Sequence, residues 1–227
     1  MELTVLGMNG PFPAANGATS GYLMRGEKTR VAMDMGSGTL GRLTALMPPE
    51  KLDALLLSHW HFDHCSDVLP LLFRLQACAA KPLDVYAPVD ESSMVRKVVQ
   101  QNSTFCLHDV QKGDEVQIGE FSVRVFAARH PVPGVMYRVT DGEKTLCYTG
   151  DKRREVYAGM VRQIKAGHQA YIVCAVIEPG EMPGVRAAAE VYEELQRTFL
   201  KDIPCALLHG KMKPKDKENV MRRFAAG

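Results

Sequence analysis

Residues 55–65 read LLLSHWHFDHC, an apolar run that ends in three histidines and one aspartate. The apolar start of this stretch predicts a strand that is buried on both faces. Alternation along an extended segment places His59 and His61 on the same face, so both imidazoles can reach one metal ion. Asp63 and His64 follow where the chain turns, and they can bind a second ion close by.

The donor atoms of this stretch define the chemistry that it can support. Nitrogen and carboxylate donors together suit zinc, and they also suit iron or manganese. Two neighbouring ions would bridge a water molecule, lower the pKa of that water towards neutrality and stabilise a tetrahedral transition state. Four such side chains in so short a stretch indicate a metal centre, whereas His108 and His168 have no motif around them and are expected at the surface.

Composition places the chain in an ordinary class. It has 227 residues, of which 46% are hydrophobic and 24% charged, as in a globular protein with one large domain or two small ones. Residues 1–10, MELTVLGMNG, lack the basic and apolar segments of a secretory signal. No apolar run approaches the roughly 20 residues of a membrane span. The six cysteines form no CxxC pair, which is typical of free thiols, so a cytoplasmic protein with no membrane contact is expected.

The pattern of the chain changes near residue 151. Short strands and turns dominate before it, whereas helix and strand patterns alternate after it. Residues 1–151 carry 14 Lys and Arg against 17 Asp and Glu, and residues 152–227 carry 14 against 9. A solvated basic face would account for this shift in net charge. The shift also agrees with a boundary between two parts of the chain near residue 151. The later part predicts helices over 154–167, 185–199 and 213–227, and strands over 169–177 and 203–210.

The histidine-rich stretch also carries a resemblance to a known family. HWHFDH is the His-x-His-x-Asp-His signature of the metallo-β-lactamase superfamily, and residues 1–151 resemble its ribonuclease Z-like branch. Asp34 in VAMDMGSG matches a structural aspartate of that family, His130 in FAARHPVPG matches its third histidine, and Asp151 in LCYTGD matches its metal-bridging aspartate. The resemblance thus implies a first site of His59, His61 and His130, and a second site of Asp63 and His64, with Asp151 bridging the two.

The same resemblance implies a fold and an activity. The expected fold is an α/β, metallo-β-lactamase-like αββα sandwich whose paired sheets carry the metals along one edge. Two zinc ions (Zn2+) are expected, or one if the second site is incomplete. Within this resemblance, an aspartate rather than a cysteine at residue 151 points to the phosphodiesterase-like branches. The expected enzyme is a hydrolase that cleaves a phosphodiester or another ester, in a small molecule or in nucleic acid, by a metal-bound hydroxide. Asp63 is the expected catalytic residue, which orients and deprotonates the water.

Residues 152–227 resemble a different family. They are similar to part of the second RecA-like domain of RecG-type DNA helicases, particularly in LLHGKMKP and VMRRFAAG. The chain lacks a GxxxxGK[ST] phosphate-binding loop, so ATP-driven unwinding is not expected. We therefore expect a metal-binding part over 1–151 and a helicase-like α/β segment over 152–227, which either completes the sandwich or packs beside it.

Two alternatives remain open at this point. His209 stands at the end of the predicted strand 203–210, where the metallo-β-lactamase family supplies its last ligand to the second site, but the helicase resemblance explains this histidine without a metal. The rival function is a nucleic-acid-binding or structural fragment without ATPase activity, making weak, salt-dependent contacts through the basic C-terminal part. A join produced by gene prediction, assembly or engineering is a third hypothesis. The sequence defines no oligomeric state.

Overall fold

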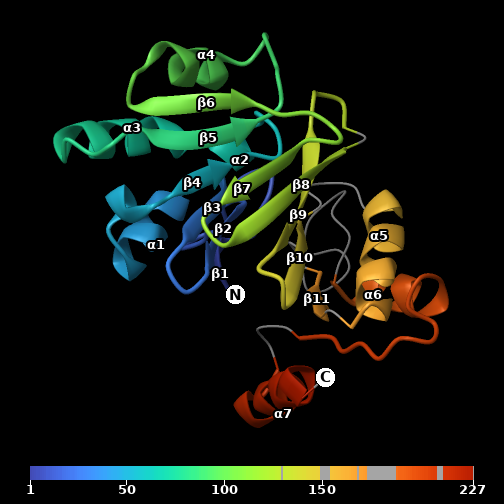
Figure 1. Cartoon of the computed structure of the whole chain (residues 1–227). Coiled ribbons are helices and arrows are strands. Elements are labelled where there is room, and N and C mark those ends of the chain that lie inside the picture. The colour runs from blue at the N-terminus through green and yellow to red at the C-terminus, as the bar shows by residue number, and fades with distance from the viewer. Residues whose placement is uncertain (129, 149–153, 168, 173–187, 209–211, 227) are drawn as a thin grey trace.

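Two β-sheets lie face to face in the structure, with helices on both outer sides (Figure 1). The structure is a computed structural model that describes residues 1–128, 130–148, 154–167, 169–172, 188–208 and 212–226. Three hydrophobic clusters fill the three interfaces between these four layers. The αββα sandwich expected from the family resemblance is therefore confirmed.

The first sheet has six strands in the spatial order β1–β2–β3–β4–β5–β6. They are β1 (Glu2–Gly7), β2 (Gly21–Arg25), β3 (Arg30–Met35), β4 (Ala54–Leu56), β5 (Leu83–Ala87) and β6 (Phe105–Asp109). β1, β2 and β3 pair antiparallel, whereas β3 to β6 run parallel. β4 is buried along its whole length, as its apolar sequence predicts, because it lies at the centre of the sandwich.

Helices cover the outer face of this sheet. They are α1 (Thr39–Leu46), the 3-10 helix η1 (Pro49–Lys51), α3 (Val68–Ala77) and α4 (Met94–Gln101). α3 buries Val68, Leu71, Leu72 and Leu75, whose spacing gives an amphipathic helix one apolar face. Ser93 caps the N-terminus of α4, and its hydroxyl oxygen accepts a hydrogen bond from the Arg96 amide at 3.2 Å.

The second sheet has five strands in the spatial order β11–β10–β9–β8–β7. They are β7 (Glu115–Ile118), β8 (Phe121–Ala127), β9 (Val135–Thr140), β10 (Lys144–Tyr148) and β11 (Gln169–Tyr171). β7 to β10 pair antiparallel, and β11 adds to β10 in parallel. Between the two sheets, Met33 and Leu56 belong to the same buried cluster as Phe121, Val123 and Tyr137.

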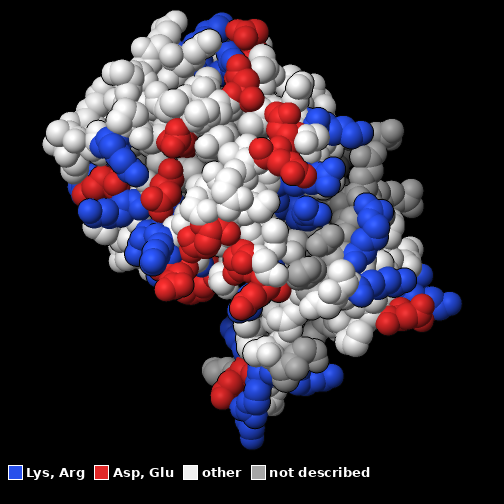
Figure 2. Space-filling view, viewed as in Figure 1, with Lys and Arg blue, Asp and Glu red and all other residues white. Residues whose placement is uncertain are grey.

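The described C-terminal residues pack on the outer face of the second sheet. α5 (Arg154–Lys165) and α6 (Ala188–Arg197) bury Tyr157, Met160 and Val191 in one cluster with Met136 and Cys147. α7 (Pro214–Ala226) lies further out, and the Gln169 side-chain amide donates a hydrogen bond to the Phe224 carbonyl. Figure 2 shows acidic and basic side chains interspersed over the face in view, with Lys and Arg also on the tip where α7 projects.

Three predicted helices correspond to α5, α6 and α7 to within two residues at their described ends, but the strand predicted over 203–210 is wrong for its described residues. Residues 203–208 belong to no strand. Their side chains alternate between half-buried and exposed, but Pro204 has no amide hydrogen for a ladder, and they pair with no described strand. Division of the chain at residue 151 stays a prediction. Among the described helices, none combines the length and the apolarity that crossing a bilayer requires.

Candidate metal centre

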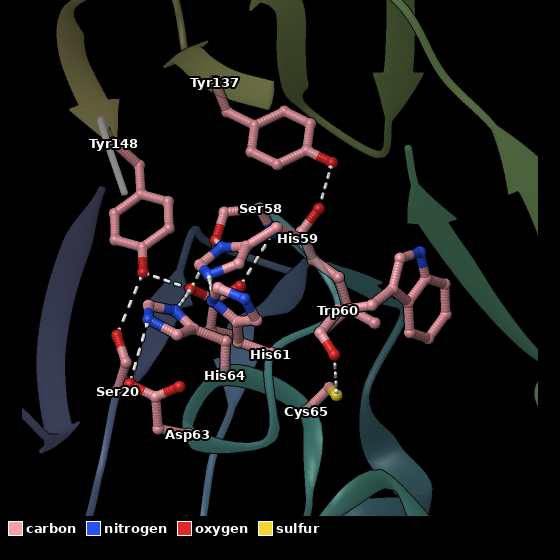
Figure 3. Close-up of polar contacts among 12 residues, drawn as sticks. Ser20, Ser58, His59, Trp60, His61, Asp63, His64, Cys65, Tyr137 and Tyr148 are labelled. Carbon is pink, nitrogen blue, oxygen red and sulfur yellow. Dashed lines mark hydrogen bonds and ion pairs between the residues drawn. The ribbon is translucent and has the colours of Figure 1, made fainter. Parts of the chain in front are cut away.

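The predicted ligands among the described residues meet where loops leave the ends of β4 and β8. Figure 3 shows those that follow β4, together with Tyr137 and Tyr148 of the second sheet. After β4 the chain runs through His59 to the short helix α2 (Phe62–Cys65). The Val135 amide, at the start of β9, donates a hydrogen bond to the Ser58 carbonyl at 2.8 Å. Next to it, His59 and Gly134 form an isolated antiparallel β-bridge. This contact brings the loop that carries His130 against the HWHFDH segment.

Three imidazole rings form the core of the site. The Nε2 atom of His59 lies 3.1 Å from the Nδ1 atom of His61. One nitrogen from each of His59, His61 and His130 falls within 4.8 Å of the others. Zinc binds histidine nitrogen at about 2.0–2.1 Å, which separates tetrahedral ligands by about 3.3–3.5 Å. Small ring movements therefore fit these three residues to one ion.

A second pair of donors stands beside the first three. The His64 ring centroid is 4.1 Å from that of His59, and the His64 Nε2 atom is 3.6 Å from the Asp63 Oδ2 atom. His64 is buried, whereas the Asp63 side chain is 17% exposed. This arrangement suits a second cation next to the first, with Asp63 on the solvent side.

A buried carboxylate lies behind these ligands. Asp34 accepts hydrogen bonds from the Ser58 amide at 2.7 Å and the Ser58 hydroxyl at 2.8 Å, from His64 Nδ1 at 2.6 Å, and from the Tyr148 hydroxyl. Burial raises the pKa of Asp34, but the charge of His64 and these hydrogen bonds outweigh it and hold the pKa below its usual value. The residue is fully buried, and its φ of 51° lies in the left-handed region, which aspartate tolerates. The carboxylate thus holds both the loop that carries His59 and the helix α2 that carries His64.

Hydrogen bonds behind the rings also set which nitrogen of each histidine faces the centre. His64 turns Nδ1 to Asp34, and His59 turns Nδ1 to the Ser58 hydroxyl at 2.9 Å. The Nε2 atoms of both rings consequently point to Asp63 and His61. Such partners are the usual way in which proteins orient metal-binding imidazoles.

Sequence reasoning missed Ser58, Tyr148 and Ser20, whose hydroxyl lies 3.1 Å from that of Tyr148. Ser58 directly precedes HWHFDH, and that position was the only signal for it. Cys65 lies in α2, but its thiol donates to the Trp60 carbonyl at 3.4 Å and burial raises its pKa far above the usual value. Its sulfur is not among the ligand atoms that lie within 4.8 Å of one another at this centre. Asp151 and His209, the two remaining predicted ligands, lie outside the described residues.

Comparison with known proteins identifies the class to which this fold and donor set belong. Residues 29–196 match the family described as "Beta-lactamase superfamily domain". The chain belongs to this metallo-β-lactamase superfamily. The "Probable metallo-hydrolase YhfI" of Bacillus subtilis is 36% identical over 156 residues, which cover 66% of this chain and 64% of that protein. Its crystal structure matches with a TM-score of 0.64 and 32% identity, covering 70% of this chain and 66% of that chain.

Two further relatives each match a part of the chain. A ribonuclease Z of Methanopyrus kandleri is 32% identical over 140 residues, covering 61% of this chain and 50% of that protein. The matched part of the chain therefore spans between half and two thirds of these curated relatives. The "ATP-dependent DNA helicase homolog RECG1" of Arabidopsis thaliana is 40% identical over 75 residues, covering 33% of this chain and 8% of that protein. That short match is compatible with the two-part sequence expected above.

Proposed function

We propose that this chain is a metal-dependent hydrolase of phosphodiesters or related esters. The observation that carries the proposal is the convergence of His59, His61 and His130, with ligand nitrogens within 4.8 Å of one another. The names of two relatives, a probable metallo-hydrolase and a ribonuclease Z, support the reaction class and the phosphodiester substrate.

Zinc is the metal that we assign to the centre. His59, His61 and His130 would hold the first ion and Asp63 and His64 the second, while Asp151 would bridge them and His209 would complete the second site. When bound, zinc would lower the pKa of a nearby water and polarise the phosphoryl oxygen of the substrate. Carboxylate and imidazole donors with a buried supporting carboxylate fit this ion well.

Asp63 is the carboxylate among these described donors, and like His61 and His130 it reaches solvent. Its carboxylate would accept a hydrogen bond from the attacking water and so fix the direction of attack, and it would then take up the proton at an oxygen. His64 lies 3.6 Å from that carboxylate and is itself held by Asp34 at 2.6 Å. The Asp34–His64 contact therefore keeps the neighbour of the catalytic carboxylate in place.

Metal analysis combined with turnover of bis(p-nitrophenyl) phosphate tests the proposal. We expect bound zinc and zinc-dependent hydrolysis in the full chain, and loss of turnover and of zinc from the metal centre after His61→Ala. The matched control is Gln101→Ala, which removes an exposed side chain on α4 and should leave metal and turnover intact. Full activity and full metal content in His61→Ala would show that the site assignment is wrong. Asp63→Asn should keep the first ion and lose most turnover.

The RECG1 match favours a second candidate function, binding to nucleic acid through the C-terminal part. α7 carries Lys215, Lys217, Arg222 and Arg223, and Figure 2 shows basic side chains on this projecting tip. Binding that rests on phosphate charge weakens steeply as salt rises. DNA binding with such a salt dependence, in a protein without zinc-dependent turnover, would support this function over hydrolysis.

A further inference from the structure

Four side chains gather on one face of β5 and β6, away from the metal centre. β5 and β6 run parallel, and their register places Asp84 opposite Cys106 and Tyr86 opposite His108. The alternate residues Leu83, Val85, Ala87 and Phe105 belong to the cluster under the helices. Asp84, Tyr86, Cys106 and His108 therefore project from the opposite face of the sheet. β6 is the edge strand of that sheet and lies beside β5 (Figure 1).

The polar atoms of this group lie close together. His108 Nε2 is 2.7 Å from Asp84 Oδ1, and the Cys106 sulfur completes a set of three ligand atoms within 4.8 Å of one another. The Tyr86 ring stacks on the His108 imidazole, with 4.6 Å between centroids and 16° between planes. The Asp84 and His108 side chains are 46% and 39% exposed, so an ion can reach them from solvent.

We propose that Asp84, Cys106 and His108 form a zinc site that is separate from the metal centre. A thiolate, an imidazole and a carboxylate are a donor set that zinc prefers, and three protein ligands leave a fourth position for water. Ligand bonds of about 2.0–2.3 Å separate tetrahedral donors by about 3.3–3.8 Å, so the Asp84–His108 contact needs to open by only about 1 Å. Binding releases the proton of the Cys106 thiol and uses a nitrogen lone pair of His108.

The surroundings of the three donors support a preformed site. The stacked Tyr86 ring fixes the plane of the His108 imidazole, as second-layer contacts do in known metal sites. Zinc held in this way would join β6, the edge strand of the first sheet, to β5.

This site is distinct from the metal centre in position and in chemistry. In the sheet register Asp84 lies opposite Ala54, the first residue of β4, whereas His59 is the third residue after that strand ends. Among the described residues, the metal centre offers only nitrogen and oxygen donors, whereas this site offers sulfur. Cobalt(II) bound to a thiolate has an intense sulfur-to-metal charge-transfer band, which His and Asp ligands do not produce.

Cobalt(II) titration of the full chain is therefore the test. We expect the charge-transfer band to saturate at stoichiometric cobalt, to disappear on addition of zinc, and to be absent in Cys106→Ser. The matched control is Cys78→Ser, which removes another exposed thiol, at the end of α3, and should keep the band. A band that survives Cys106→Ser, or that appears only at large cobalt excess as for an adventitious ion, would overturn the proposal.

Affinity gives a second readout that does not depend on sulfur. His108→Ala and Asp84→Asn should each weaken zinc binding at this site at least about tenfold, since losing even a supporting hydrogen bond costs about 10–100-fold. All three donors are partly or largely exposed, so these variants should retain the circular dichroism of the parent chain. Unchanged zinc affinity in both variants would contradict the assignment.

Discussion

The hydroxyl group of Tyr148 donates a hydrogen bond to the carboxylate of Asp34, which lies 114 positions earlier in the chain. Tyr148 ends β10 in the second sheet, and Asp34 lies in β3 of the first. The contact therefore ties the two sheets together immediately behind the metal centre. In the sequence Tyr148 also stands three residues before Asp151, the proposed bridging ligand, so the same bond anchors the strand that leads to it.

Tyr148→Phe should destabilise the protein by about 1.5–3 kcal/mol, the usual contribution of a hydrogen bond to a charged group. The aromatic ring and its packing are kept, so the loss reports the hydroxyl alone. Urea unfolding of the metal-free protein measures it. Tyr192→Phe is the matched control, because its hydroxyl makes a contact of 3.5 Å with the Cys205 carbonyl and should contribute little. Equal losses in the two variants would argue against a special role for the Tyr148–Asp34 pair.

Ser58→Ala should lower zinc affinity at the metal centre by about 10–100-fold. The Ser58 hydroxyl contacts His59 Nδ1 at 2.9 Å and donates to Asp34 at 2.8 Å, so its removal frees the imidazole to rotate. Competition with a chelator measures the affinity. Ser66→Ala serves as the control, because the buried Ser66 hydroxyl has no hydrogen-bond partner among the described residues. The prediction fails if both alanine variants bind zinc as tightly as the parent.

Gly36→Ala should displace α2 and weaken the metal centre. A β-carbon at position 36 would stand 1.9 Å from the Asp63 carbonyl oxygen and 2.1 Å from the Thr19 hydroxyl, so backbone must move. Overpacking of this kind costs about 1–3 kcal/mol. Thermal unfolding and zinc affinity should both fall.

Gly41→Ala, within α1, is the matched control for that change. A β-carbon at position 41 meets nothing within 4 Å. Because alanine favours the helix by up to about 1 kcal/mol over glycine, this variant should be as stable as the parent or more so. If both glycine variants lost stability equally, steric contact with Asp63 could not be the cause.

Much of the site could be predicted because its signals are local. His59, His61, Asp63 and His64 fall within one short stretch, and helices such as α3 follow from the spacing of apolar residues. The strand predicted over 203–210 from its apolar sequence failed because an apolar run alone does not make a strand, which also needs a partner for its backbone groups. The side-chain pattern of residues 203–208 is present, but the ladder is not.

The contacts that the sequence did not reveal are those between distant strands. Nothing in the sequence near Tyr148 indicates Asp34 as its partner, because the pairing depends on how the two sheets stack. Asp84 and His108 meet through the register of β5 and β6, which local pattern leaves undefined. His108 was expected at the surface, and its partial exposure agrees with that prediction. Only the fold shows which residues lie beside it.

The ionisation of Asp34 should shape the stability of the metal-free protein at low pH. Its pKa is lowered from the usual 3.8 because the charge of His64 and several hydrogen bonds outweigh burial. For a carboxyl with a lowered folded-state pKa, the stabilisation is present above the unfolded pKa and is lost as pH falls through the folded value. Urea unfolding between about pH 6 and pH 2 should show this loss, and Asp34→Asn should flatten it.

Asp67 provides a control of opposite sign for the pH series. Burial raises the pKa of Asp67 above the usual value, although the amide of Leu40 donates to its carboxylate at 2.8 Å. A carboxyl whose folded-state pKa is raised lowers stability as pH rises through its titration, so Asp67→Asn should steepen the net rise of stability with pH where Asp34→Asn flattens it. Because the comparison uses slopes, any pH-independent loss from either substitution cancels. If the slope of stability against pH changed in the same direction in both variants, the ionisation of Asp34 could not explain the loss of stability at low pH.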